Sequence, residues 1–168
     1  MSLIPPARRE LFKGSGHFFT NTIQTTRGCP FDCEFCSVTA FYGRKYRKRP
    51  VEQVLGELEQ LRKVNSFVFF VDDNIVADRR YSLPLFEGMK GMGLKWLSHA
   101  PIDFAEDQEL LKAAGESGCV GMFVGFESLN QDALTAMGKV NNRAASYHEY
   151  ARQFRDHGIG ILGSFVMG

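Results

Sequence analysis

Three cysteines within eight residues give the sequence its clearest capacity for chemistry. Cys29, Cys33 and Cys36 form a CxxxCxxC motif. Thiolates are soft ligands, and thiolates this close together are typical of iron–sulfur clusters or zinc sites. A structural zinc site needs a fourth ligand, and the candidate histidines stand far from the motif, at His99, His148 and His157. The motif therefore favours a cluster with one iron left open for reaction, and zinc is the alternative.

The remaining cysteine and the setting of the motif argue against disulfides. Cys119 stands alone in an apolar run, which predicts a small buried side chain rather than a ligand. A disulfide framework spreads its pairs along the chain and requires an oxidising compartment. The N-terminal residues, MSLIPPARRELF, do not read as a secretory signal, so we expect a cytoplasmic protein.

Composition excludes several other classes of protein. The chain has 168 residues, the size of one compact domain, and its 44% hydrophobic and 23% charged residues are ordinary for a globular protein. No apolar run approaches the ~20 residues that span a bilayer, so no membrane partner is expected. The 20 basic and 19 acidic side chains leave a formal charge of +1, which argues against a dedicated nucleic-acid binder.

One basic run departs from this even balance. The segment RKYRKR, at positions 44–49, has a basic side chain at every position except its tyrosine. Such a run could bind phosphate or RNA. A solvated loop in front of a helix is the interpretation that we prefer.

The segments that must position these residues alternate between strands and helices. Apolar or alternating runs predict strands at residues 21–27, 67–71, 94–100, 119–126 and 159–166. Periodicity and capping predict helices between them, over 51–61, 78–90 with Asp78 as cap, 106–116, after the Asn130 cap, and 142–157. This alternation is typical of βαβ units in a parallel sheet, whose ligands bind at the carboxyl ends of the strands. The cysteine motif follows the first strand and therefore lies at that end.

The cysteine motif and its flanks resemble the radical S-adenosylmethionine (SAM) superfamily, in which CxxxC-x-aromatic-C follows the first strand. Phe35 stands at the aromatic position. The segments TIQTTRGCPFDCEFCSV, RKYRKRPVEQV, FFVDDNI and GMFVGFESL are similar to the class found beside cobalamin (B12)-binding domains. The resemblance, from about residue 8 onward, implies an α/β fold: a parallel-sheet partial (βα) barrel truncated after its fifth strand. Residues 1–20 would be an N-terminal linker segment, and 21–168 an incomplete core.

The resemblance also implies a mechanism. Cys29, Cys33 and Cys36 would each ligate one iron of a [4Fe–4S] cluster, and SAM would chelate the fourth. One-electron reduction by a flavodoxin- or ferredoxin-type protein would cleave SAM to a 5′-deoxyadenosyl radical that attacks an unknown substrate. Phe35 would pack near the adenine, and cobalamin would take part only through a domain absent from this chain. A non-catalytic iron–sulfur or electron-transfer module and an RNA-modifying fragment are the alternative functions.

Two aspartates follow the second predicted strand, at the same end of the sheet as the cysteines. In similar enzymes this strand end, here Asp72 and Asp73, meets the amino group of SAM, a cation that a carboxylate suits. The alternative is a turn or a helix cap, for which Asp and Asn are common residues. Because side chains alternate along a strand, at most one of the two aspartates need point inward.

The other candidate cofactor-binding residues are Glu127, Ser128 and Lys139. Glu127 and Ser128 end the fourth predicted strand, and Lys139 follows a short helix. In similar enzymes the strand-end carboxylate accepts hydrogen bonds from ribose hydroxyls, and a basic residue near the position of Lys139 meets the SAM carboxylate. The alternatives are a solvated strand end and a lysine that complements a helix dipole.

Overall fold

The computed structural model describes residues 5–11 and 21–167, and within them five parallel strands form one curved sheet. The strand order is β1-β4-β5-β6-β7, and a separate antiparallel pair joins β2 to β3. The strands of the large sheet are β1 (Thr22–Ile23), β4 (Phe67–Phe70), β5 (Lys95–His99), β6 (Cys119–Glu127) and β7 (Gly160–Phe165). The small pair consists of β2 (Thr26–Arg27) and β3 (Arg47–Lys48).

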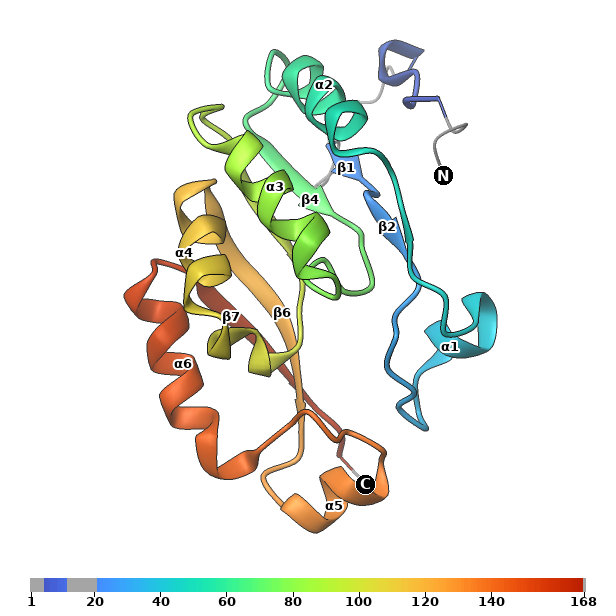
Figure 1. Ribbon diagram of the computed structural model, residues 1–168, viewed down its shortest axis with the longest axis vertical. Helices are drawn as coiled ribbons and strands as arrows, with labels where there is room; N and C mark the ends of the chain where they lie inside the picture. Colours follow the sequence, from blue (N-terminus) through green and yellow to red (C-terminus); the bar gives the residue numbers. More distant parts are fainter. Residues whose placement is uncertain (1–4, 12–20, 168) are drawn as a thin grey trace.

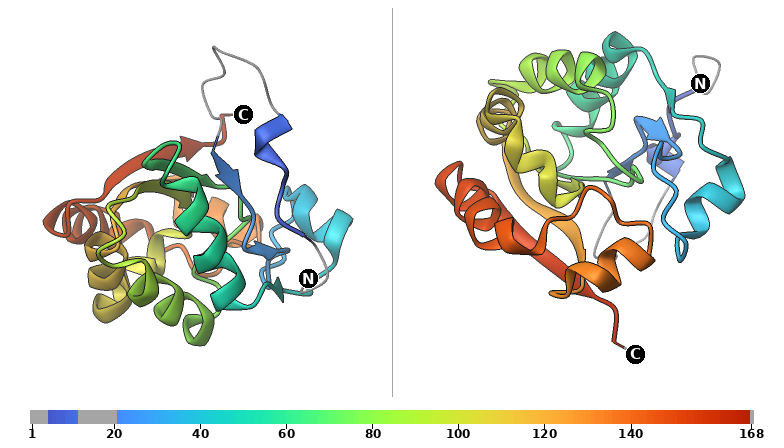
Figure 2. Two further views of the ribbon diagram at one scale, coloured as in Figure 1. Left: turned by 90° about the horizontal axis from the view of Figure 1, so that it is seen from above. Right: turned by 60° about the horizontal axis from the view of Figure 1, so that its bottom comes forward.

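The longer helices cover the outer, convex face of the large sheet (Figures 1 and 2). They are α2 (Val51–Leu61), α3 (Arg79–Met89), α4 (Gln108–Glu116) and α6 (Tyr147–Asp156). The short helices α1 (Ser37–Tyr42) and α5 (Gln131–Ala136) lie apart from this layer, and three 3₁₀ turns occupy Arg9–Leu11, Ile102–Glu106 and Ala144–Ser146. The arrangement confirms the predicted α/β class and the partial (βα) barrel. Among the described helices, none is long and apolar enough to cross a membrane.

Local sequence signals account for the helix boundaries. The Asp78 carboxylate accepts a hydrogen bond from the Arg80 amide at the start of α3, and Asn130 caps α5 by accepting from two amides. Both predicted caps are therefore confirmed. Helix α2 begins directly after Pro50, whose missing amide hydrogen costs nothing at that position.

Aromatic side chains fill the layer between the outer helices and the sheet. Trp96 of β5 is fully buried, and its ring centroid lies 5.3 Å from that of Phe70 and 5.1 Å from that of Phe86. Its indole nitrogen donates to the Ser117 hydroxyl at 3.2 Å, which satisfies the one polar atom in this cluster. Cys119 is buried in the same sheet, as predicted, and burial raises its pKa to about 12.

The concave face of the sheet carries a second aromatic group. Phe69, His99 and Phe123 come from three neighbouring strands, with ring centroids between 5.2 and 5.7 Å apart. His99 and Phe123 are direct register partners in the pairing of β5 with β6. These rings therefore cover the centre of the inner face. The polar residues lie past the rings, at the carboxyl ends of the strands.

The single strand predicted over 21–27 is wrong, because the chain leaves the large sheet midway. β1 pairs with β4, whereas β2 pairs with β3 in the small sheet. At the break, the Asp72 carboxylate accepts hydrogen bonds from the amides of Thr25 and Thr26, at 2.8 and 2.5 Å, and from the Thr25 hydroxyl at 2.8 Å. A buried side chain thus takes the place of a neighbouring strand as partner for this backbone.

The solvated-loop interpretation of residues 44–49 is wrong at its last position. Arg49 is 6% exposed, and its guanidinium lies 2.7 Å from Glu57, a buried carboxylate on α2. Arg9 reaches the other oxygen of Glu57 at 2.5 Å. Buried carboxylates require such partners, so one basic residue of the run is structural, and the other four are exposed. Of the predicted linker, residues 1–20, only 5–11 lie within the described residues.

The role of Asp72 as a backbone anchor predicts a specific pattern of stability. Asp72→Ala leaves two buried amide hydrogens without acceptors, and each costs about 1–3 kcal/mol. We expect the free energy of unfolding of Asp72→Ala, measured in urea, to be about 2–4 kcal/mol lower than that of the wild type. Asp72→Asn keeps an acceptor oxygen for both amides and should lose much less. Equal losses in the two variants would contradict the anchoring role.

Candidate functional site

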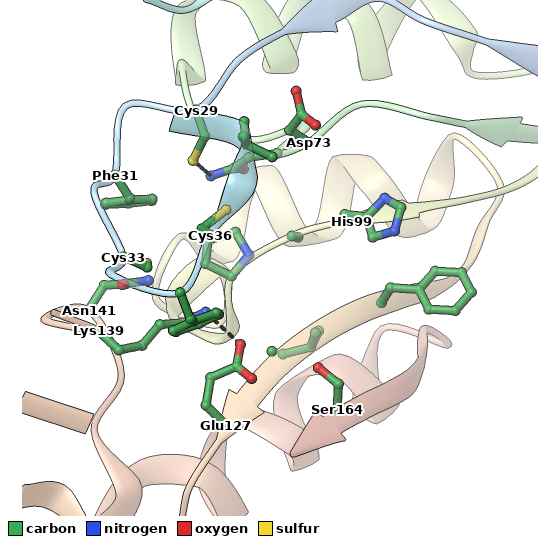
Figure 3. A pocket seen from close by; sticks show the side chains of 18 of the residues that line it. Cys29, Phe31, Cys33, Cys36, Asp73, His99, Glu127, Lys139, Asn141 and Ser164 are labelled. Atoms are coloured by element: carbon green, nitrogen blue, oxygen red, sulfur yellow. Dashed lines mark hydrogen bonds and ion pairs between the residues drawn. The ribbon is translucent and has the colours of Figure 1, made fainter. Parts of the chain in front are cut away.

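A cavity of about 420 Å³ lies at the carboxyl ends of the strands, between the cysteine loop (residues 28–36) and the inner face of the sheet (Figure 3). It brings together most of the candidate residues that the sequence indicates: Cys29, Cys33, Phe35, Cys36, Asp73, Glu127 and Lys139. Asp72 and Ser128 are not among the residues that line it.

The cysteine loop is held in place from two sides. At its start, the Gly28 amide donates to the Asp73 carboxylate at 2.9 Å. Further along, the Glu34 amide donates to the carbonyl of Met137, at the end of α5, at 3.2 Å. Gly28 adopts a φ of +89°, and a Cβ there would lie 2.2 Å from the Lys45 carbonyl oxygen, so this turn requires glycine.

The three thiols are free and half-buried around the cavity. Figure 3 shows Cys29 and Cys36 on the side of Asp73, and Cys33 nearer to Lys139. Burial raises the pKa of both Cys29 and Cys33, and the positive charge of Lys139 opposes this rise at Cys33.

The donor set fits one kind of metal centre and not another. Within residues 5–11 and 21–167, no group of three Cys, His, Asp or Glu side chains is arranged to hold one metal ion. A cluster has a different requirement, because each thiolate binds a separate iron. Three half-buried thiols beside a cavity of this size fit an iron–sulfur cluster, whose usual ligands are thiolates.

The two aspartates after β4 point to different partners, as alternation along a strand predicts. Asp72 is fully buried against the backbone of Thr25 and Thr26, and burial raises its pKa to about 6, although these hydrogen bonds oppose the rise. Asp73 lines the cavity and holds Gly28. The structure therefore presents only Asp73 to a ligand in the cavity.

A largely buried ion pair lines the cavity beside the cysteine loop, at the end of β6. Lys139 Nζ lies 3.0 Å from Glu127 Oε1, and the two side chains are 13% and 9% exposed. Glu127 has a φ of +63°, an uncommon conformation for a residue with a side chain. A Cβ on Gly125 would lie 2.1 Å from Glu127 Oε1, so the carboxylate folds back into space that only glycine leaves open. Sparse conformations of this kind concentrate at functional sites.

Phe35 and Ser128 lie near the Glu127–Lys139 ion pair and have different surroundings. Phe35 is 49% exposed, and Lys139 Nζ lies 5.7 Å from its ring centroid. The Ser128 hydroxyl instead accepts a hydrogen bond from the Asn130 amide at the start of α5. Phe35 is thus available to a ligand in the cavity, whereas Ser128 acts in the turn.

Asn74 and His99 also line the cavity, although neither was assigned to the cofactor from the sequence. Asn74 follows Asp73, and His99 ends β5, so both stand at strand ends, which is the signal that could have indicated them. His99 Nδ1 lies 3.2 Å from the Asp72 carbonyl oxygen, which can only accept, so this nitrogen carries the hydrogen. Burial lowers the pKa of His99 and favours the neutral ring.

Comparison with known protein families shows which family the chain belongs to. The family model of the radical SAM superfamily matches residues 23–168, nearly the whole chain. The chain belongs to the radical SAM superfamily. Members of this family are enzymes that use a [4Fe–4S] cluster and SAM, which agrees with the resemblance found in the motif.

Curated relatives of this radical SAM chain include methyltransferases. It is 38% identical over 150 residues to the bacteriochlorophyllide d C-12(1)-methyltransferase of Chlorobaculum tepidum, covering 87% of this chain and 33% of that protein. It is 31% identical over 176 residues to the hopanoid C-2 methylase of Rhodopseudomonas palustris, covering 100% and 33%. The chain thus spans about a third of the length of these relatives.

Solved structures of cobalamin-dependent radical SAM enzymes share the fold. The methyltransferase TsrM from Kitasatospora setae, solved with cobalamin and a [4Fe–4S] cluster, superposes with a TM-score of 0.78 at 18% identity, covering 88% of this chain and 31% of that one. OxsB, solved with aqua-cobalamin, gives 0.73 at 20% identity, covering 87% and 23%. The similarity to the class associated with cobalamin is therefore confirmed.

Two glycines of the radical SAM chain provide a test of how the cysteine loop is held. Gly28→Ala combines a strained φ with a collision against the Lys45 carbonyl, whereas Gly43, at φ +65°, has open space around it. Both alanines are strained by about 1–3 kcal/mol, because both glycines have φ values that residues with a side chain rarely adopt. We expect Gly28→Ala to lower the free energy of unfolding by more than Gly43→Ala does. Equal effects would show that the close approach at Gly28 is unimportant.

Proposed function

We propose that Cys29, Cys33 and Cys36 hold a [4Fe–4S] cluster at this cavity, and that the protein cleaves SAM reductively there. When bound, the cluster supplies the electron that breaks the sulfonium bond, which gives the 5′-deoxyadenosyl radical. The observation that carries the proposal is the position of three free thiols around one cavity, with a largely buried ion pair beside them. Metal ligands at the mouth of a sheet, where a substrate can reach them, suit a reaction site.

The charged groups around the cavity match the charges of SAM. SAM carries an amino group, a carboxylate, a sulfonium and a ribose with two hydroxyls. We assign the amino group to Asp73, the carboxylate to Lys139 and the ribose hydroxyls to Glu127, with Phe35 beside the adenine. Opposite charges and charge-assisted hydrogen bonds support each pairing, and the positions of these residues around the cavity support the set.

The whole protein is proposed to be a methyltransferase. The relatives named above and TsrM carry this activity in their names, and TsrM binds cobalamin. Cobalamin would be held by sequence outside these 168 residues. A flavodoxin- or ferredoxin-type protein would deliver the electron, and the free thiols favour a reducing compartment such as the cytoplasm.

Removal of single thiols tests the cluster assignment. After anaerobic reconstitution, we expect Cys29→Ala, Cys33→Ala and Cys36→Ala each to lose most of the bound iron and the visible absorption of the cluster. Because Cys119 is buried in the sheet away from the cavity, Cys119→Ala is the matched control and should keep both. Reduction with dithionite in the presence of SAM should yield 5′-deoxyadenosine in the wild type and in this control.

The outcome of that experiment separates the alternatives. A cluster whose electron paramagnetic resonance (EPR) signal ignores SAM, with no 5′-deoxyadenosine formed, would indicate a non-catalytic iron–sulfur module. A colourless protein with one zinc ion per chain would reject the proposal altogether.

The ion pair provides a separate test of SAM binding. Glu127→Gln keeps the size of the side chain but removes the charge that would hold the ribose hydroxyls, an interaction worth about 1.5–3 kcal/mol. We expect the Kd for SAM, measured by calorimetry on the reconstituted protein, to rise about 10- to 100-fold with the iron content unchanged. Glu149→Gln, at an exposed glutamate on α6, is the control. An unchanged Kd in Glu127→Gln would remove Glu127 from the site.

A further inference from the structure

Asn74 makes a contact with the cysteine loop that neither its backbone position nor the proposed SAM site requires. It follows Asp73 after β4, is 3% exposed, and lines the cavity. Its side-chain nitrogen Nδ2 lies 3.9 Å from Cys29 Sγ, at hydrogen-bonding distance for a sulfur acceptor. Figure 3 marks this contact by the dashed line at Cys29.

The contacts of Asn74 fix which end of its amide faces the sulfur. Its oxygen Oδ1 accepts a hydrogen bond from the Val76 amide at 3.2 Å, so the nitrogen must be the atom that points to Cys29. The backbone around it is held as well, because the Asn74 carbonyl accepts from the Tyr46 hydroxyl at 2.8 Å. The Ile75 amide donates to the His99 carbonyl at 3.1 Å.

A role in the turn alone leaves half of this geometry unexplained. Asparagine commonly stabilises turns by accepting a hydrogen bond from the amide two residues later, as Asn74 does from Val76. That interaction uses only the oxygen. The nitrogen is directed separately at one cysteine thiol, and this second contact is the part that bears on cluster chemistry.

We propose that Asn74 is a positioning residue that donates an N–H hydrogen bond to the sulfur of Cys29 in the cluster-bound protein and thereby raises the reduction potential of the cluster. This inference rests on the proposed function, since it requires Cys29 to be a cluster ligand. Hydrogen bonds to cluster sulfurs are one of the factors that set these potentials.

The direction of the effect follows from charge. Reduction of the [4Fe–4S] cluster from the 2+ to the 1+ state adds one electron, supplied by the reductant, and makes the cluster and its sulfur ligands more negative. An N–H group directed at a ligand sulfur stabilises the more negative state more strongly. The Asp73 carboxylate is negatively charged and therefore has the opposite effect on the reduced cluster. It already accepts a hydrogen bond from the Gly28 amide. Asn74 therefore provides a fixed positive dipole next to Cys29.

Two substitutions remove the donor in different ways. Asn74→Leu replaces the amide with an apolar group of similar size. Asn74→Asp keeps an acceptor for the Val76 amide, replaces the N–H group with oxygen and adds a negative charge beside Cys29. Asn141→Leu is the matched control, because Asn141 lines the same cavity but donates to Asp103, at 3.3 Å, rather than to a cysteine.

The experiment is an EPR-monitored redox titration of the anaerobically reconstituted proteins without SAM, together with their iron content. At the midpoint potential of the wild type, we expect the ratio of reduced to oxidised cluster to fall about tenfold in Asn74→Leu, a shift of about 59 mV to more negative potential for one electron. The ratio should fall further in Asn74→Asp, because its added negative charge also disfavours the reduced cluster. Asn141→Leu should titrate like the wild type.

Each other outcome overturns the inference in a distinguishable way. If the Asn74 variants load the same iron and titrate at the wild-type potential, the inference fails and the proposed function stands. If the wild type itself takes up no cluster, both fail together. If Asn74→Leu loses the cluster, Asn74→Asp still tests the inference, because a wild-type potential in that variant would overturn it. Loss of the cluster from both variants would mean that Asn74 is needed for assembly rather than for the potential, and would also overturn the inference.

Discussion

The two carboxylates at the end of β4 are the constraint on which the rest of the site depends. Asp72 turns outward and holds the backbone of Thr25 and Thr26, where the chain leaves the large sheet. Asp73 turns inward and holds the Gly28 amide, where the cysteine loop begins. Since consecutive side chains of a strand point to opposite sides, one dipeptide fixes both the exit of the chain from the sheet and the start of the loop.

The end of β6 is built on a different principle. There, one residue of uncommon conformation, Glu127, and the empty space above Gly125 let a carboxylate fold back over its own strand. Lys139 neutralises that charge in a largely buried position, so the pair is tolerated without a ligand. Thiols beside a paired acid and base give the cavity groups of both charges, within a fold otherwise closed by aromatic rings.

Much of this architecture could be predicted from the sequence because it depends on local patterns. The apolar stripe of α2, the Asp78 and Asn130 caps and the apolar runs of the inner strands each depend on residues a few positions apart. Predictions failed where a distant partner decides. The strand at 21–27 divides because a carboxylate 46 residues away in the chain accepts from its Thr26 amide, and Arg49 is buried because Glu57 lies on the inner face of α2. The sequence of a basic run does not show which of its side chains has a buried acidic partner.

The sequence by itself determined the kind of chemistry, because thiolates in a CxxxCxxC spacing after a strand can bind metal centres of only a few kinds. It also determined the end of the sheet at which the thiols lie, since a parallel sheet presents the loops that follow its strands on one side. Only the tertiary structure decided which polar groups face the thiols. The Ser128 hydroxyl and the Asn74 oxygen accept from amides two residues further along the chain, which leaves Glu127 and the Asn74 nitrogen to reach the cavity. Asp73 rather than Asp72 reaches it because the amides of Thr25 and Thr26, in a distant segment, take the Asp72 carboxylate. That competition is settled only when the segments are packed together.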